Sequence, residues 1–82
     1  MKRKKAQRGY LVSLGNPLRP NPDFIVVSEN IKSAYLAAER HLKRMGFFDL
    51  KIIRRNPCLD FEATSPTKIT YVFYLVPMTL VR

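Results

Sequence analysis

The side chains that most often act as catalytic nucleophile and base occur once each in this chain, as Cys58 and His41. A cysteine nucleophile needs a histidine within hydrogen-bonding distance and a third group that orients that base. The local pattern places His41 on the flank of a helix and Cys58 after a proline in a loop. Nothing in their spacing therefore brings the two together.

The carboxylates and the glycines give no stronger indication of an active site. Asp60 and Glu62 form the one close pair of acids suited to acid–base catalysis. The sequence has no cluster of His, Cys and carboxylates that could hold a metal, and no Gly-rich phosphate-binding loop. We therefore expect that the protein is not an enzyme and that it uses no metal or cofactor.

Positive charge is the strongest chemical signal in the sequence. The chain has 15 Lys and Arg against 6 Asp and Glu residues, a formal net charge of +9. Its first eight residues contain no acid and carry five cations: Lys2, Arg3, Lys4, Lys5 and Arg8. Such a segment has nothing apolar to bury, so we expect a flexible basic arm at 1–8 ahead of one domain at 9–82. Basic arms bind phosphates by releasing counterions, although charge alone can also serve only solubility.

The remaining composition indicates a soluble protein of a reducing compartment. The 82 residues suffice for one domain with a thin core, and the one cysteine cannot form an internal disulfide. No long apolar run follows the basic N-terminus, as it would in a signal peptide. The longest apolar stretch, at 71–76, is far shorter than the roughly 20 residues of a spanning helix. We expect a cytoplasmic protein with no membrane partner.

The residues before position 30 indicate two strands. Residues 9–14 alternate, with Tyr10, Val12 and Leu14 on one side. Residues 15–23 contain three prolines and form a loop, and residues 24–27 form a second short strand. We expect the two strands to pair as a hairpin with a long connection.

A helix is predicted between Asn30 and Gly46, because Asn30 suits an N-cap and Gly46 the position after a C-cap. One face of this helix is apolar at helical spacing and should meet the core. Its members are Ile31, Ala34, Tyr35, Ala38, Leu42 and Met45. The opposite face carries cations around one leucine. These residues are Lys32, Leu36, Arg40, Lys43 and Arg44.

Two further strands are predicted at 50–55 and 68–76, with a turn at 56–67 between them. The order predicts an α+β fold: a two-layer β-β-α-β-β sandwich with one helix packed on a four-stranded, mainly antiparallel sheet. A right-handed crossover places the third strand parallel to the second with the first between them, and the fourth beside the third. The helix covers one face of this sheet and leaves the other face open.

The basic helix face is the first candidate binding surface. Its cations could follow a phosphate backbone, and Arg54 with Arg55 would extend that patch where the third strand leaves the sheet. The alternative is an ordinary solvated face. Two features favour binding: Glu39 is the one acid on this face, and Leu36 is an apolar group among the cations.

The open sheet face is the second candidate surface. Both alternating sets of the last strand are apolar, so the set that turns away from the helix needs a cover. We expect that cover to come from the chain itself or from a second copy in a homodimer. Alternatively, Tyr74 beside Lys51 or Arg55 could stack nucleic-acid bases.

The stretch FIVVSENIKSAYLAAERHLKRMGFFDLKIIRRNPC, residues 24–58, resembles the small phage-encoded inhibitors of bacterial RNA polymerase. The shared pattern is a short apolar strand, Ser-Glu, a polar cap, and an Ala-rich helix with Ala34, Ala38 and Glu39. An arginine-rich strand closing at Pro-Cys follows. The resemblance implies a non-catalytic module whose Arg54 and Arg55 contact the polymerase. The outline is also similar to small phage anti-CRISPR proteins and to a large-subunit ribosomal protein family.

These observations leave three hypotheses open. In the first, a small basic phage protein docks on a nucleic-acid-processing complex of the host, such as RNA polymerase or a CRISPR complex, and blocks access to it. In the second, the chain is a direct RNA-binding module of the ribosomal-protein type. In the third, it is a structural homodimer that buries the open sheet face. The expected location is the cytoplasm, that of the host cell for a phage protein.

Overall fold

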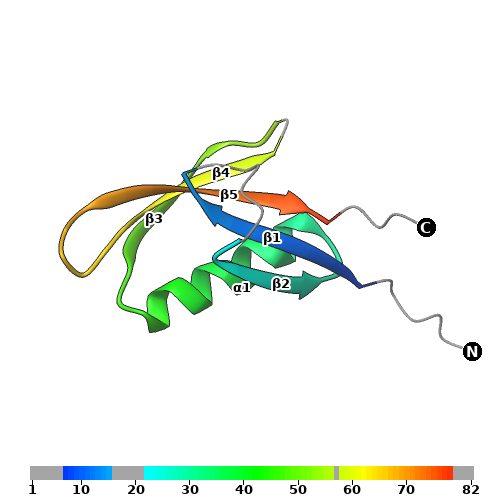
Figure 1. The fold of residues 1–82 in the computed structure, drawn as a ribbon, viewed down its shortest axis with the longest axis horizontal. Helices are drawn as coiled ribbons and strands as arrows, with labels where there is room; N and C mark the ends of the chain where they lie inside the picture. The colour runs from blue at the N-terminus through cyan, green and yellow to red at the C-terminus, as the bar shows by residue number, and fades with distance from the viewer. Residues whose placement is uncertain (1–6, 16–21, 57, 79–82) are drawn as a thin grey trace, which may run out of the picture.

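The computed structural model describes residues 7–15, 22–56 and 58–78. Within these ranges, five strands form one antiparallel sheet and one helix crosses a face of it (Figure 1). The elements are β1 (Arg8–Leu14), β2 (Phe24–Ser28), α1 (Ile31–Arg44), β3 (Phe48–Arg54), β4 (Leu59–Thr64) and β5 (Thr70–Pro77). The α+β class is confirmed, with five strands in place of the predicted four.

Strand β4 occupies residues that the sequence analysis assigned to a turn. Leu59, Phe61 and Ala63 are buried at every second position, which is the pattern of a strand with one face on the core. Ser, Pro and Thr residues follow this segment and favour a turn. They form only the β4–β5 connection, in which the Ser65 N–H donates to the Ile69 carbonyl over 2.8 Å.

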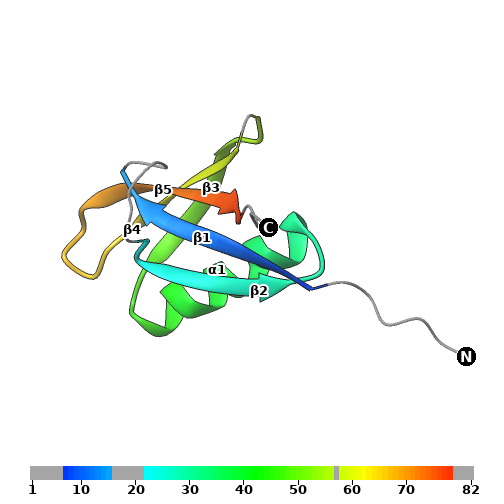
Figure 2. The ribbon, with the colours of Figure 1, turned by 45° about the vertical axis from the view of Figure 1, so that its right-hand side comes forward.

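The sheet order is β2-β1-β5-β4-β3, and Figure 2 shows β1 between β2 and β5. The predicted β1–β2 hairpin is confirmed. The predicted pairing of β3 with β1, and of β5 with β3, is wrong because β4 and β5 lie between β1 and β3. Since all neighbours are antiparallel, β2 and β3 run in the same direction at opposite edges, and α1 connects them across the sheet.

Helix α1 is bounded by the capping residues that the sequence predicts. The Oδ1 atom of Asn30 accepts a hydrogen bond from the Ser33 N–H at 2.9 Å. Gly46 has a φ of 95°, and the following Phe47 N–H donates to the Leu42 carbonyl at 3.0 Å. A Cβ at position 46 would lie 2.8 Å from a side-chain carbon of the β4–β5 turn. The end of α1 therefore requires glycine at position 46, both for the space beside the β4–β5 turn and for the positive φ.

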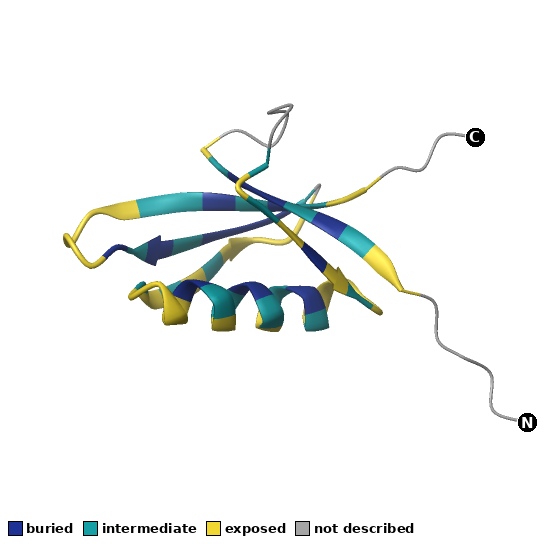
Figure 3. Ribbon diagram, turned by 60° about the horizontal axis from the view of Figure 1, so that its bottom comes forward, coloured by how far each residue is buried: buried dark blue, intermediate teal, exposed yellow. Residues whose placement is uncertain are grey.

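The core lies between α1 and the sheet. Ala34 and Ala38 are fully buried, and Figure 3 shows the buried residues of α1 on the side that faces the strands. The fully buried Phe61 ring stacks on Phe73 with centroids 5.4 Å apart, and it meets the Tyr35 ring edge-on at 5.1 Å. These aromatic contacts attach the first half of α1 to β4 and β5.

The two ends of the predicted apolar stripe on α1 are not buried. Ile31 is 36% exposed and Met45 is 55% exposed, whereas Leu42 is 1% exposed. The sheet therefore covers the middle of the helix more completely than its first turn. This incomplete cover at the first turn is what opens the groove described below.

Part of the predicted basic arm lies outside the described residues, and so do positions 16–21, 57 and 79–82. The arm residues concerned are Lys2, Arg3, Lys4 and Lys5. Arg8, the last residue assigned to the arm, is exposed and is the first residue of β1, where it pairs with Ser28.

Candidate docking groove

A groove of about 420 Å³ lies between the first half of α1 and the strands β3 and β4. We call it the α1–β3 groove. Its lining is apolar apart from two cations. The lining residues are Ile31, Lys32, Tyr35 and Leu36 of α1, Ile52 of β3, Arg55 just beyond β3, and Leu59 of β4. Three predicted binding residues, Lys32, Leu36 and Arg55, thus come together from two separate parts of the sequence.

The groove exists because α1 lies over the β2 side of the sheet. The helix packs mainly against β2 and leaves β3 only partly covered, so Ile52 is half-buried. Strand β3 is also irregular: its pairing with β4 shifts register twice. Asp49 has a positive φ of 52°, and such local distortions bend an edge strand and re-aim its side chains.

The second register shift, between Ile52 and Arg54, decides which of the two arginines faces the groove, because neighbouring residues of a strand already point to opposite faces. Ile52 pairs with Phe61 on the helix-facing side, but after the shift Arg54 pairs with Asp60, whose side chain lies on the opposite face. A shift of one residue turns every later side chain to the other face of the sheet. Arg55 therefore reaches the α1–β3 groove, and Arg54 does not. The predicted joint patch of the two arginines stays a prediction, and of the two only Arg55 lines this groove.

The polar side chains of the lining residues, Lys32, Arg55 and Tyr35, can all donate hydrogen bonds. The ammonium group of Lys32 and the guanidinium group of Arg55 carry positive charge. A tyrosine hydroxyl is protonated at neutral pH, and burial, with the charge of Glu39 second, raises the pKa of Tyr35 further. The groove therefore suits an apolar group that sits next to an anionic or hydrogen-bond-accepting group.

The other predicted cations of α1 lie outside the groove lining. Arg40, Lys43 and Arg44 are exposed on the side of the helix away from the sheet. The Nε atom of Arg44 lies 3.5 Å from the Arg40 carbonyl, a long contact that caps the last turn of the helix. With Lys32 they form a basic strip along α1, which meets the groove at Lys32 and at Leu36, 47% exposed.

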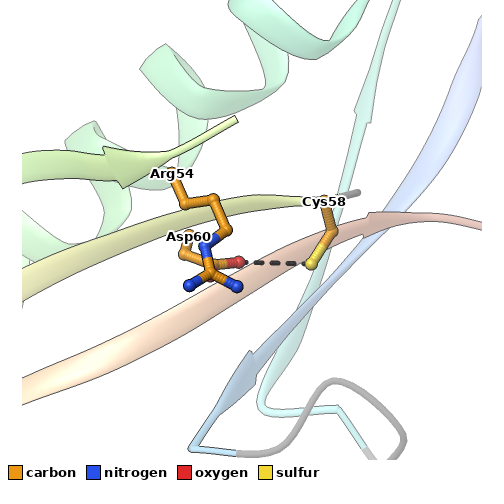
Figure 4. A network of polar contacts seen from close by, with 3 residues as sticks. All are labelled: Arg54, Cys58 and Asp60. Carbon is orange, nitrogen blue, oxygen red and sulfur yellow. Dashed lines mark hydrogen bonds and ion pairs between the residues drawn. The ribbon is translucent and has the colours of Figure 1, made fainter. Parts of the chain in front are cut away.

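On the other face of the sheet, Asp60 links Arg54 with Cys58 (Figure 4). The Arg54 Nε atom lies 3.8 Å from an oxygen of the buried Asp60 carboxylate. The Cys58 thiol donates a hydrogen bond of 3.2 Å to the other oxygen. Burial raises the pKa of Cys58, and Asp60 raises it further, while Arg54 lowers it. Cys58 is thus held as a neutral thiol, unlike an activated nucleophile.

The structure keeps Cys58 apart from His41. The His41 ring packs against Phe24 at 4.5 Å between centroids, on the helix side of the sheet near β2. The Cys58 thiol bonds Asp60 on the opposite face, near β3. The two acids considered for acid–base catalysis, Asp60 and Glu62, lie opposite cations in the β3–β4 ladder. Glu62 pairs with Lys51, and Asp60 pairs with Arg54.

The face of the sheet away from α1 does not place a cation directly beside Tyr74. The register puts Tyr74 between Ser13 of β1 and Asp60 of β4. Ser13 and Asp60 are both buried, and Tyr74 is half-buried. The most exposed apolar residues of the strands on this face lie at its β2 margin, where Ile25 is 53% and Val27 is 64% exposed.

Comparisons of the chain with protein-family models, with curated proteins and with solved structures find no significant match. The resemblance to phage inhibitors consequently stays a prediction. In the described part of the chain, no group of three or more potential ligand side chains is placed to hold a metal ion. The described helix, at fourteen residues, falls short of the length and apolarity that crossing a membrane requires.

Four lining residues of the groove were not predicted as binding residues: Ile31, Tyr35, Ile52 and Leu59. Ile31 and Tyr35 belong to the apolar stripe, which a helical pattern assigns to the core. Ile52 lies in a strand that the pattern gives no reason to leave uncovered. The alternation of Leu59, Phe61 and Ala63 was a usable signal for β4, and it would have placed Leu59 beside β3.

Proposed function

We propose that this protein is a non-enzymatic binding protein that docks on a nucleic-acid-processing complex through the α1–β3 groove and the basic strip of α1. The single observation that carries the proposal is the convergence of Lys32, Leu36 and Arg55 on one apolar groove. A purely solvated charged face would need no apolar cavity beside it.

The chemistry of the groove favours a protein surface as the direct contact. An apolar side chain of the partner would enter between Tyr35, Leu36 and Ile52, while an acidic group beside it would meet Lys32 or Arg55. The net charge of +9 would draw the chain toward assemblies that carry nucleic acid. Blocking access to such a machine, as the phage-inhibitor hypothesis holds, requires only this kind of docking.

Direct reading of RNA is the second candidate function, and the outer sheet face supports it less. Base stacking needs an accessible aromatic ring with cations near it. Tyr74 is half-buried and has the carboxylate-bearing Asp60 directly across the ladder. RNA binding would thus have to use the basic strip of α1 and the groove beside it, whose lining has Tyr35 as its aromatic residue.

The proposal is tested by capture from a nuclease-treated bacterial lysate, with bound proteins identified by mass spectrometry. Wild type is compared with the double variant Lys32→Glu and Arg55→Glu, and with Lys68→Asp as a control of the same sign. Lys68 lies in the β4–β5 turn with a φ of 66°, which aspartate tolerates, and it is exposed.

We expect wild type and Lys68→Asp to retain the same component of a nucleic-acid machine, and the groove variant to lose it. Equal retention by all three would contradict docking through the groove. A parallel titration with labelled RNA separates the second candidate. Tight RNA binding that falls by roughly 0.7 log units per log unit of salt for each phosphate contact would make the chain an RNA reader.

A further inference from the structure

Strand β2 forms an edge of the sheet that has no charged side chain. Its sequence is FIVVS. The pairing with β1 runs through five consecutive residue pairs without a register shift. In the described part of the chain, no other strand pairs with its outer edge. A regular, apolar edge strand presents free N–H and C=O groups to any strand that can approach it.

The opposite edge differs in each of these respects. Strand β3 carries Asp49, Lys51 and Arg54, and its pairing is interrupted by two register shifts. Charged side chains and bulges are the devices by which proteins prevent unwanted pairing at sheet edges. The β3 edge therefore carries features that prevent strand pairing, and the β2 edge lacks them. This difference indicates that another strand pairs with β2.

We propose that β2 pairs antiparallel with β2 of a second copy, so that two sheets continue through a two-fold axis. The segment is suited to pairing with itself. When Val26 lies opposite Val26 of the second copy, Ile25 faces Val27 and Phe24 faces Ser28. Every cross-strand pair is then uncharged, and the β-branched pairs are of the kind that stabilises sheets.

Charge opposes the approach of a second copy less at this edge than elsewhere. A chain of net charge +9 repels its own kind, so two copies can approach best where cations are scarce. Asp23 and Glu29 bracket β2 and lower the positive potential there. In the same register these two acids face each other across the axis, and salt would screen their repulsion as it screens that of the cations.

The broad face of the sheet is a less suitable interface than this margin. Its central positions, Ser13 and Asp60, are already buried within one chain. The exposed apolar residues Ile25 and Val27 lie at the β2 margin and would be covered by edge pairing. Five paired residues bury much less than the about 1,600 Å² of a standard interface. We therefore expect a weak, concentration-dependent dimer.

The test is sedimentation equilibrium of the full chain over a wide range of protein and salt concentration. We expect the average mass to rise from 9.5 kDa toward twice that value as protein concentration increases. Added salt should strengthen association, because it screens like charge and leaves apolar contacts intact. Nucleic-acid binding would respond to salt in the opposite direction.

Val27→Lys tests the location of the interface, and Ile53→Lys is its matched control. Both residues are exposed, at 64% and 48%, and both substitutions add one positive charge to an edge strand. We expect Val27→Lys to remain a monomer at every concentration, and Ile53→Lys to associate as wild type does. Ile25→Lys provides a second variant on the same margin, with circular dichroism as the check that each variant is folded.

Amide hydrogen exchange of the wild type tests whether β2 forms the interface, even if a variant fails to fold. Amides of β2 should become more protected as protein concentration rises, while those of β3 stay unchanged. A chain that is monomeric at millimolar concentration and high salt would overturn the proposal. Equal loss of association in Val27→Lys and Ile53→Lys would overturn it as well. Partner binding at the α1–β3 groove is a separate property, so either proposal can fail without the other.

Discussion

Edge strand β3 has two register shifts and three charged residues, whereas edge strand β2 has an unbroken register and none. The β3 end of the sheet carries the α1–β3 groove with Lys32 and Arg55. The β2 end carries the exposed Ile25 and Val27. The sheet thus has one irregular edge strand with charged residues beside a cationic groove, and one regular edge strand without charged residues.

The difference shows how a chain of 82 residues can offer two contact surfaces without two domains. Irregularity at β3 opens a cavity and prevents strand addition, which suits a partner that contributes side chains. Regularity at β2 favours strand addition, which suits a partner that contributes backbone. The helix joins the two ends, because it follows β2 directly and precedes β3.

The largest effect on stability is expected from Phe61→Ala, which removes the aromatic contacts between α1 and the β3 end of the sheet. Phe61 is fully buried and contacts the rings of Tyr35 and Phe73. The loss of such a side chain lowers the free energy of unfolding by about 3–5 kcal/mol. Urea denaturation measures this, and Phe48→Ala, at a position 41% exposed, should show a much smaller loss. Equal losses would contradict the placement of the core under β4.

The next largest effects are expected on partner binding at the groove and on self-association at β2, each from a different variant. The double variant Lys32→Glu and Arg55→Glu should weaken partner binding roughly tenfold, ~1.4 kcal/mol, because both groove cations become anions. It should not weaken self-association, because a lower positive charge reduces the repulsion between copies. Val27→Lys should abolish self-association and leave partner binding unchanged. Affinity measurements on the captured partner, together with sedimentation, test both halves. A folded variant that loses both partner binding and self-association would contradict the separation of the two surfaces.

A smaller effect distinguishes the adjacent arginines within the β3 end. Arg54 lowers the pKa of Cys58, so Arg54→Gln should raise that pKa and slow alkylation of the thiol by about twofold at mildly alkaline pH. Arg55→Gln should leave the alkylation rate unchanged, because Arg55 lines the groove on the other face. The rate of reaction with iodoacetamide measures this. Equal slowing in both variants would show that the two side chains share a face.

The smallest expected effect is on stability at alkaline pH. The pKa values of Cys58 and Tyr35 are raised in the folded chain, so both groups favour the protonated state on folding. Their contribution to stability is complete below the ordinary pKa of each group and is lost as pH rises through the raised value. Urea midpoints from neutral to strongly alkaline pH should fall accordingly. Cys58→Ser should remove the part of that fall due to the thiol.

Local sequence patterns were sufficient to predict α1 and the β1–β2 hairpin. Asn30 and Gly46 identify the helix ends because capping depends on residues that are close in sequence. Strand β4 was missed because the whole of residues 56–67, which include two prolines, was assigned to a turn, although Leu59, Phe61 and Ala63 alternate within it. Without β4, no sequence argument could place β5 in the middle of the sheet.

The groove was only partly predictable, because it depends on tertiary arrangement. Lys32 and Leu36 were found from the helix face on which they lie. A register shift decides which of Arg54 and Arg55 faces the groove, and this shift arises from pairing with β4 and leaves no pattern in β3 itself. Lys2, Arg3, Lys4 and Lys5 remain predicted contacts outside the described residues.

The most direct test of the docking proposal is site-specific photo-crosslinking in a bacterial lysate. A photoreactive amino acid is placed at Leu36, beside the groove, or at Ile69, which is similarly exposed in the β4–β5 turn. Docking through the groove should give a protein adduct from a nucleic-acid-processing complex at Leu36 that survives nuclease treatment, with little adduct at Ile69. Equal adducts at both positions, or adducts at Leu36 with nucleic acid alone, would contradict docking of a protein partner in the groove.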